Sequence, residues 1–191
     1  MTTSTLHLQP QTLETGSAKA KDVLERARKQ VGFIPNMYSA MANVPALLET
    51  YLFGYNQFRT ESGFNAAEQE VVLLTISREN GCEYCVAAHS FMADVKSGVP
   101  VETTDAIRNG TAISCAKMSA LNQFTMQLLS TRGRPSERDV AVFVAAGYSE
   151  QHVLDILLAI SVKTISNYAN HMFNTPLDAV FQARAWTVTR A

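Results

Sequence analysis

Apolar residues recur along most of the chain at spacings of three and four, the period of an amphipathic helix. The clearest example begins at Pro45 and carries leucine and aromatic residues at these spacings. Residues that cap helix starts, such as Asn65 and Ser149, stand where the pattern resumes after a break. The alternation of strand and helix patterns that a parallel sheet needs is missing. The predicted fold class is therefore all-α.

The starts and stops also predict the individual elements. Residues 1–17 lack apolar periodicity and are expected to form an N-terminal arm, with residues 18–191 as a single domain. Residues 71–76 are rich in β-branched side chains, but Asn65 followed by Glu68 forms a capping pattern that favours a helix. Helices are expected over residues 18–31, 38–41, 45–62, 66–80, 82–97, 104–109, 114–129, 136–146 and 150–173, with a further turn or two in the tail.

Two parts of the chain resemble one another when the sequence is shifted by 82 residues. The shift aligns His89 with His171, together with several apolar and acidic positions around them. This similarity suggests a decayed internal duplication of one helical hairpin. The second copy has Thr164 and Asn167 where the first has two cysteines, so thiol chemistry is expected in one half only.

The composition narrows the possible partners and compartment. The 191 residues are 47% hydrophobic, and sixteen basic against seventeen acidic residues leave a net charge of -1. No block of like charge is present, which argues against nucleic acid or a membrane as partner and favours a small neutral substrate. The longest apolar run, residues 153–162, is too short to span a bilayer. With no secretory signal pattern and an odd count of three cysteines, reduced thiols in the cytoplasm are expected.

Residues that carry chemistry are concentrated between Glu70 and His89. Cys82, Cys85 and His89 are three and four positions apart, so they share one face of a helix. Cys82 is expected in the first helical turn after the break at Asn80-Gly81, where free backbone amides favour a thiolate.

Glu70 lies on the helix before this break. If the two helices form an antiparallel pair, Glu70 and His89 come within roughly one turn of the same level. The hypothesis is a relay from Glu70 to His89 to Cys85, directly or through water, with Cys82 as a second thiol that closes a disulfide.

This constellation resembles a known family. Glu70, the run Cys-Glu-Tyr-Cys-Val-Ala-Ala-His at 82–89 and the apolar helix before it are similar to the alkylhydroperoxidase D-like (AhpD-like) branch of the carboxymuconolactone decarboxylase family. Residues 32–37 (Gly-Phe-Ile-Pro-Asn-Met) and 45–48 resemble its peroxidase-related members. The similarity covers roughly residues 30–175. It implies an AhpD-like helical bundle that assembles into homo-oligomers.

The resemblance also implies an activity and assigns roles. It implies a thiol-dependent peroxidase that reduces hydrogen peroxide or organic hydroperoxides, with electrons from a dithiol or a protein donor. Cys85 would attack the peroxide, Cys82 would resolve the intermediate, and His89 with Glu70 would relay protons. Decarboxylase members of the family lack the cysteine pair. Tyr84 departs from the pattern, because some peroxidase members carry a histidine there.

Other interpretations stay open. The same thiols suit a disulfide-reductase adaptor for a partner peroxidase, and a carboxymuconolactone decarboxylase-like or non-enzymatic oligomeric protein is a further alternative. No cofactor or metal is predicted, although a zinc site would have to recruit Cys115, His152 or His171. Cys115 is otherwise expected in the core, the two histidines in structural positions or at a subunit contact, and Tyr51, Tyr55 and Phe58 in the core or along an apolar channel to the thiols.

Overall fold

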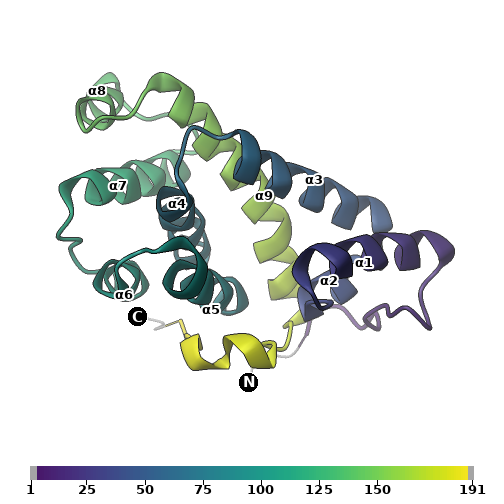
Figure 1. Cartoon of the computed structure of the whole chain (residues 1–191). Helices are drawn as coiled ribbons and strands as arrows, with labels where there is room; N and C mark the ends of the chain where they lie inside the picture. Colours follow the sequence, from purple (N-terminus) through teal and green to yellow (C-terminus); the bar gives the residue numbers. More distant parts are fainter. Residues whose placement is uncertain (1–3, 189–191) are drawn as a thin grey trace.

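Helix α4 (Ala66–Glu79) packs against α5, α6, α7 and α9 and organises the fold (Figure 1). The computed structural model describes residues 4–188, and every regular element in that range is helical, which confirms the all-α fold class. None of the helices in this range has the length and apolarity needed to cross a membrane. The other elements are α1 (Ala18–Val31), α2 (Asn36–Met41), α3 (Pro45–Glu61), α5 (Glu83–Met92), the π-helix η1 (Ala93–Ser97), α6 (Val101–Asn109), α7 (Ala116–Ser130), α8 (Glu137–Ala145), α9 (Glu150–Phe173) and the 3₁₀-helix η2 (Ala179–Arg184).

Most helix boundaries lie within two residues of those predicted. Gly32, with φ of 92°, ends α1 in the left-handed conformation that glycine adopts at little cost. Helices α2 and α6 begin two and three residues earlier than predicted, because Pro35 and Pro100 occupy their N-cap positions. The helix predicted over residues 82–97 instead divides into α5 and the π-helix η1.

The predicted duplication of a helical hairpin is wrong. Residues 68–91 form two helices separated at Gly81, whereas residues 150–173 form the single uninterrupted helix α9. At the position of Gly81 the second copy carries Lys163, and lysine favours the helical conformation far more than glycine does. The sequence similarity between residues 68–91 and 150–173 therefore reflects similar helix composition and not a repeated fold.

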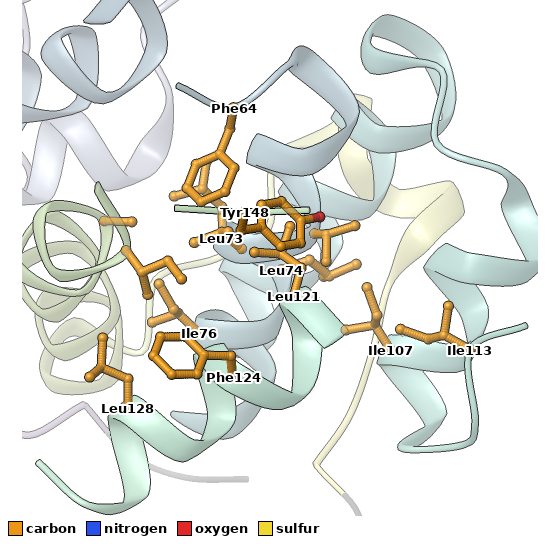
Figure 2. Packing of buried hydrophobic residues seen from close by; sticks show 14 of the residues in the cluster. Phe64, Leu73, Leu74, Ile76, Ile107, Ile113, Leu121, Phe124, Leu128 and Tyr148 are labelled. Carbon is orange, nitrogen blue, oxygen red and sulfur yellow. The ribbon is translucent and has the colours of Figure 1, made fainter. Parts of the chain in front are cut away.

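One hydrophobic cluster surrounds α4 on the side of α6, α7 and α8 (Figure 2). Leu73, Leu74 and Ile76 of α4 are fully buried there. Phe143 stacks between Phe124 and Tyr148, with ring centroids 4.3 and 4.6 Å away. Each buried leucine or isoleucine contributes roughly 1.5–3 kcal/mol. This cluster fixes the position of α4, the helix that carries Glu70.

A second cluster joins α1, α2, α3, α5 and the C-terminal half of α9, and it contains both cysteines of the motif. A β-carbon at Gly54 of α3 would lie 2.9 Å from Cγ2 of Val162, so the missing side chain lets α3 and α9 pack closely. The helix η2 lies below α5 and the C-terminal end of α9 in Figure 1, and its Phe181 packs against the rings of Tyr84 and Phe91. The site residues therefore come from helices that are distant in sequence.

The capping box at the start of α4 provides a direct test of local stability. The Asn65 side chain accepts a hydrogen bond from the Glu68 backbone amide at 3.0 Å, and the Glu68 carboxylate accepts from the Asn65 amide at 3.1 Å. Asn65→Ala is expected to lower the free energy of unfolding by about 1 kcal/mol, measured by urea denaturation. Asn56→Ala, at an exposed position inside α3, is the control and should change it by less than about 0.5 kcal/mol. Equal effects of the two changes would contradict a stabilising cap.

Candidate active site

The break between α4 and α5 places the two thiols. Gly81 has φ of 66°, a conformation that costs other residues about 1–2 kcal/mol, and it turns the chain so that Cys82 becomes the N-cap of α5. The prediction that Cys82 lies in the first helical turn is therefore wrong by one position, and Cys85 lies in that turn instead. The Cys82 amide donates to the Ser77 carbonyl at 2.9 Å, which ties the turn back to α4.

The two thiols share a buried environment but differ in acidity. Asn170 of α9 donates its side-chain amide to Cys85 Sγ at 3.2 Å and to Cys82 Sγ at 3.7 Å. Burial opposes ionisation of Cys85, but a hydrogen bond from Cys82 and the charge of Lys163 bring the pKa of Cys85 well below its usual value. Burial and the same hydrogen bond raise the pKa of the Cys82 thiol. Cys85 is therefore the more acidic of the two thiols.

Glu70 and His89 meet as predicted. Glu70 Oε2 lies 2.9 Å from His89 Nδ1, and Glu70 Oε1 accepts a hydrogen bond from Arg59 of α3. Burial opposes the charge on Glu70, but His89 and Arg59 hold its pKa below 4.5, so Glu70 is ionised. Burial and the charge of Lys163 lower the pKa of His89, so the imidazole is neutral. Because Glu70 is the acceptor, the proton of His89 lies on Nδ1.

The other nitrogen of His89 does not face a cysteine. Its Nε2 lies 2.9 Å from Nζ of Lys163, a side chain of α9 that is only 1% exposed. Because Nδ1 carries the proton, Nε2 accepts a hydrogen bond from the lysine. The contacts thus run in a row from Glu70 through His89 to Lys163, and the predicted relay step from His89 to Cys85, directly or through water, stays a prediction. The chemical roles of these residues stay predictions.

Sequence reasoning missed Lys163, Asn170 and Arg59, which all come from α3 and α9. A signal for Lys163 was available, because it directly follows the apolar run 153–162, where a lysine is rarely left without a partner. Arg59 and Asn170 gave no such signal, since arginine and asparagine are common on exposed helix faces.

Aromatic residues line the site on the side of α3. The predicted stripe is in the core, with Tyr51 3% and Phe58 0% exposed. Tyr55, the third residue of the stripe, is partly buried and reaches the site, because its hydroxyl accepts from Arg59 at 2.6 Å and its ring centroid is 6.5 Å from that of His89. Burial raises the pKa of Tyr51 and Tyr55, so both phenols are neutral.

Tyr84, the departure from the peroxidase pattern, anchors the C-terminal segment. Its hydroxyl donates to the carboxylate of Asp178, which also accepts from the Asn36 amide at 3.2 Å. The side chain is turned toward η2 and the start of α2. Tyr84 thus links the cysteine turn to the segment that covers this end of the site.

The remaining candidates lie outside the site. Cys115 is exposed at the N-cap of α7, so its predicted place in the core is wrong. It follows a short loop whose residues are mostly exposed. His152 caps α9 through Ser149 Oγ at 2.7 Å, and His171 is exposed near the end of that helix. Within residues 4–188, no three histidine, cysteine, aspartate or glutamate side chains form a cluster that could hold a metal ion.

The comparison with family models matches residues 42–126 to the carboxymuconolactone decarboxylase family. The matched segment contains Glu70, both cysteines and His89. The match spans 85 of the 191 residues of the chain. A comparison with curated proteins gives no match.

Solved structures share the fold of this chain over nearly its whole length. An alkylhydroperoxidase AhpD core, a peroxidase-related protein from Ralstonia eutropha JMP134, is 17% identical with a TM-score of 0.78, covering 92% of this chain and 96% of that one. A peroxidase-related protein from Silicibacter sp. TM1040 is 20% identical with a TM-score of 0.76, covering 95% of each chain. A cysteine-to-alanine variant of the debrominase Bmp8 in complex with 2,3,4-tribromopyrrole is 15% identical with a TM-score of 0.74, covering 94% of this chain and 95% of that one. The predicted AhpD-like fold is confirmed.

Proposed function

We propose that this protein is a thiol-dependent oxidoreductase of the peroxidase type, which reduces hydrogen peroxide or organic hydroperoxides by cycling Cys82 and Cys85 between dithiol and disulfide. The observation that carries the proposal is the division of acidity between the two thiols. The pKa of Cys85 is lowered and that of Cys82 is raised, while Asn170 contacts both sulfurs. A reactive thiolate beside a protonated resolving thiol is what reversible peroxide chemistry requires.

The proposed cycle has two covalent steps. The Cys85 thiolate attacks the terminal oxygen of the hydroperoxide, the O–O bond breaks, and a sulfenic acid forms on Cys85 while the alkoxide leaves. The sulfur of Cys82 then attacks Cys85, an S–S bond forms, and water leaves with the proton of Cys82. A dithiol or a protein donor supplies two electrons to restore the thiols. Glu70 and His89 act as proton-relay residues, because Glu70 fixes the tautomer of His89.

The family and the fold support this proposal. Two structural neighbours are named as peroxidase-related, and both share the fold over more than nine-tenths of this chain. The cysteine pair argues against a decarboxylase-type activity, because the decarboxylase members of the family lack this pair.

The disulfide itself is the direct test. Reduced protein mixed with one equivalent of cumene hydroperoxide is expected to lose two hydrogens in mass, and peptide mapping should place the new bond between Cys82 and Cys85. Cys115→Ser is the matched control, because this exposed cysteine lies outside the site and its replacement should change neither the mass shift nor the rate. Peroxide that is left unconsumed, or a bond that involves Cys115, would show the proposal to be wrong.

An adaptor that reduces a partner peroxidase would use the same disulfide. It predicts slow consumption of peroxide by the purified protein, with the dithiol form restored by a dithiol reductant at a normal rate. Steady-state peroxide consumption with excess dithiothreitol therefore separates the two, because only a direct peroxidase turns over rapidly.

The neighbour named as a debrominase favours one further candidate, the reduction of a brominated aromatic ring. The two thiols would supply the electrons, a C–H bond would replace the C–Br bond, and bromide would leave as the disulfide forms. The test is bromide release from brominated pyrroles by the reduced protein. Release that is faster than peroxide consumption would favour this candidate over the peroxidase.

A further inference from the structure

The charges buried at the site fall into two pairs. Glu70 is ionised and accepts hydrogen bonds from Arg59 and His89. Helix α9 meets α5 through Lys163 at His89 (2.9 Å) and, two turns further on the same face, through Asn170 at Cys85 (3.2 Å). This contact places the Lys163 side chain on the face of α9 that turns toward Cys85, and its positive charge favours ionisation of that thiol. His89 is neutral. The site as a whole therefore carries no net charge when the thiols are reduced.

Lys163 has no carboxylate partner among the contacts of the described residues. Its Nζ donates to Nε2 of His89 at 2.9 Å, and the side chain is 1% exposed. A buried ammonium group is costly unless a negative charge compensates it. Glu70 is already balanced by Arg59, so the Cys85 thiolate is the group that compensates Lys163.

We propose that Lys163 is the counter-charge of the Cys85 thiolate in the reduced protein and the proton donor to the oxygen that leaves when peroxide is reduced. The proposal rests on the proposed peroxidase function and deepens it. It assigns to Lys163 a step that sequence analysis gave to His89.

The proton and electron balance of this step is complete. The Cys85 thiolate gives an electron pair to the terminal oxygen, and the O–O bond breaks to release an alkoxide. The alkoxide takes a proton from Lys163, which becomes a neutral amine, and an alcohol leaves. Cys82 then closes the disulfide and its proton leaves with the hydroxyl of the sulfenic acid as water.

The site stays neutral throughout this sequence, which is the physical argument for it. Forming the disulfide removes the negative charge of Cys85. If Lys163 kept its proton, an ammonium group without a partner would remain in the interior. Transfer of that proton to the alkoxide removes both charges together. Cys85 ionisation and Lys163 protonation are thus coupled.

Other groups around Cys85 and Lys163 do not offer a better donor. The three tyrosines Tyr38, Tyr51 and Tyr55 are kept neutral, since burial raises the pKa of each phenol above its usual value. The remaining titratable groups that face the cluster are Arg59 on α3, Glu70 on α4, and Cys82, Tyr84 and His89 on α5. Burial and the hydrogen bond to Asp178 raise the pKa of Tyr84, and the Nδ1 proton of His89 is held by Glu70. Arginine does not release a proton in proteins, Glu70 is ionised, and the proton of Cys82 is used in the second step.

The counter-charge is tested by alkylation, which needs no peroxide. Cys85 is reacted with iodoacetamide over a range of pH in the Cys115→Ser background, and the modified residue is identified by peptide mass. Lys163→Met is expected to slow the reaction at neutral pH at least tenfold and to shift its pH profile upward, with the rates converging in alkali. Lys117→Met is the control, because Lys117 is half exposed and pairs with Glu68 at 2.8 Å. An unchanged pH profile, or one lowered equally at every pH, would overturn the counter-charge role.

The proton-donor role is tested by counting protons during oxidation of the wild-type protein. Diamide takes two electrons and two protons to form a disulfide, so it replaces peroxide and keeps the test independent of peroxidase activity. If Lys163 gives up its proton, no proton is taken up from a weakly buffered solution for each disulfide formed. Uptake of one proton per disulfide would overturn the proposal, provided that the alkylation test shows Cys85 to be ionised before oxidation.

Lys163→Arg separates the two roles. Arginine keeps the positive charge and does not release a proton. This variant is expected to keep the neutral-pH reactivity of Cys85 with iodoacetamide and to take up one proton for each disulfide. Loss of thiolate reactivity in Lys163→Arg, with a normal unfolding transition, would contradict a role as counter-charge.

Discussion

Cys85→Ser is expected to lower kcat/KM for peroxide reduction by about 10³-fold or more, because it removes the one thiol whose pKa is brought below its usual value. The serine hydroxyl keeps the size of the thiol and accepts the hydrogen bond from Asn170, so the fold should be retained. The measurement is peroxide consumption with excess dithiothreitol. Consumption at the parent rate would show that Cys85 is not the attacking residue.

Cys82→Ser separates attack from resolution. The raised pKa of Cys82 makes it a poor attacker, but it is placed to resolve the sulfenic acid. This variant is expected to consume about one equivalent of peroxide, more slowly than the parent because the hydrogen bond to Cys85 is weakened, and then to stop. Dimedone should trap the sulfenic acid on Cys85. If Cys82→Ser is inert and Cys85→Ser is trapped on Cys82, the two roles are reversed.

Glu70→Gln is expected to lower the free energy of unfolding by about 3–5 kcal/mol, the range for removal of one member of a buried ion pair. Glu70 is fully buried and accepts from Arg59 and His89, so its loss leaves the Arg59 guanidinium, whose side chain is only 19% exposed, without a compensating charge. Urea denaturation near neutral pH measures the difference. Glu79→Gln is the control on the same helix, because its side chain is 30% exposed, and it should change stability by less than about 1 kcal/mol.

The pH dependence of this difference has a defined sign. The pKa of Glu70 is lower in the folded protein than its ordinary value of 4.5, so the folded state favours the ionised form. Its contribution is fully present above 4.5 and is lost as the pH falls through the lowered value. The gap between parent and Glu70→Gln should therefore narrow only in acid. A gap that is unchanged down to strongly acidic pH would contradict the ion pair as its source.

The helices could be predicted from residues that are close together in the sequence. Asn65 with Glu68, Pro45 and Gly32 act on the backbone within one turn, so the boundaries of α4, α3 and α1 could be predicted from them. Local spacing likewise placed the cysteines and His89 on neighbouring turns. The contact between Glu70 and His89 followed from the spacing as well, because two helices joined by a short turn pack antiparallel.

Only the tertiary structure decided how the site is charged. Lys163 and Asn170 reach it from α9 and Arg59 from α3, and no local rule relates positions so far apart in the chain. Burial makes each charge depend on its partner, because water no longer compensates it. The sequence alone therefore determined that the two thiols and the imidazole of His89 are close together. The packing of α3 and α9 decided which of the two thiols is the more acidic, and it placed Lys163 against Nε2 of His89.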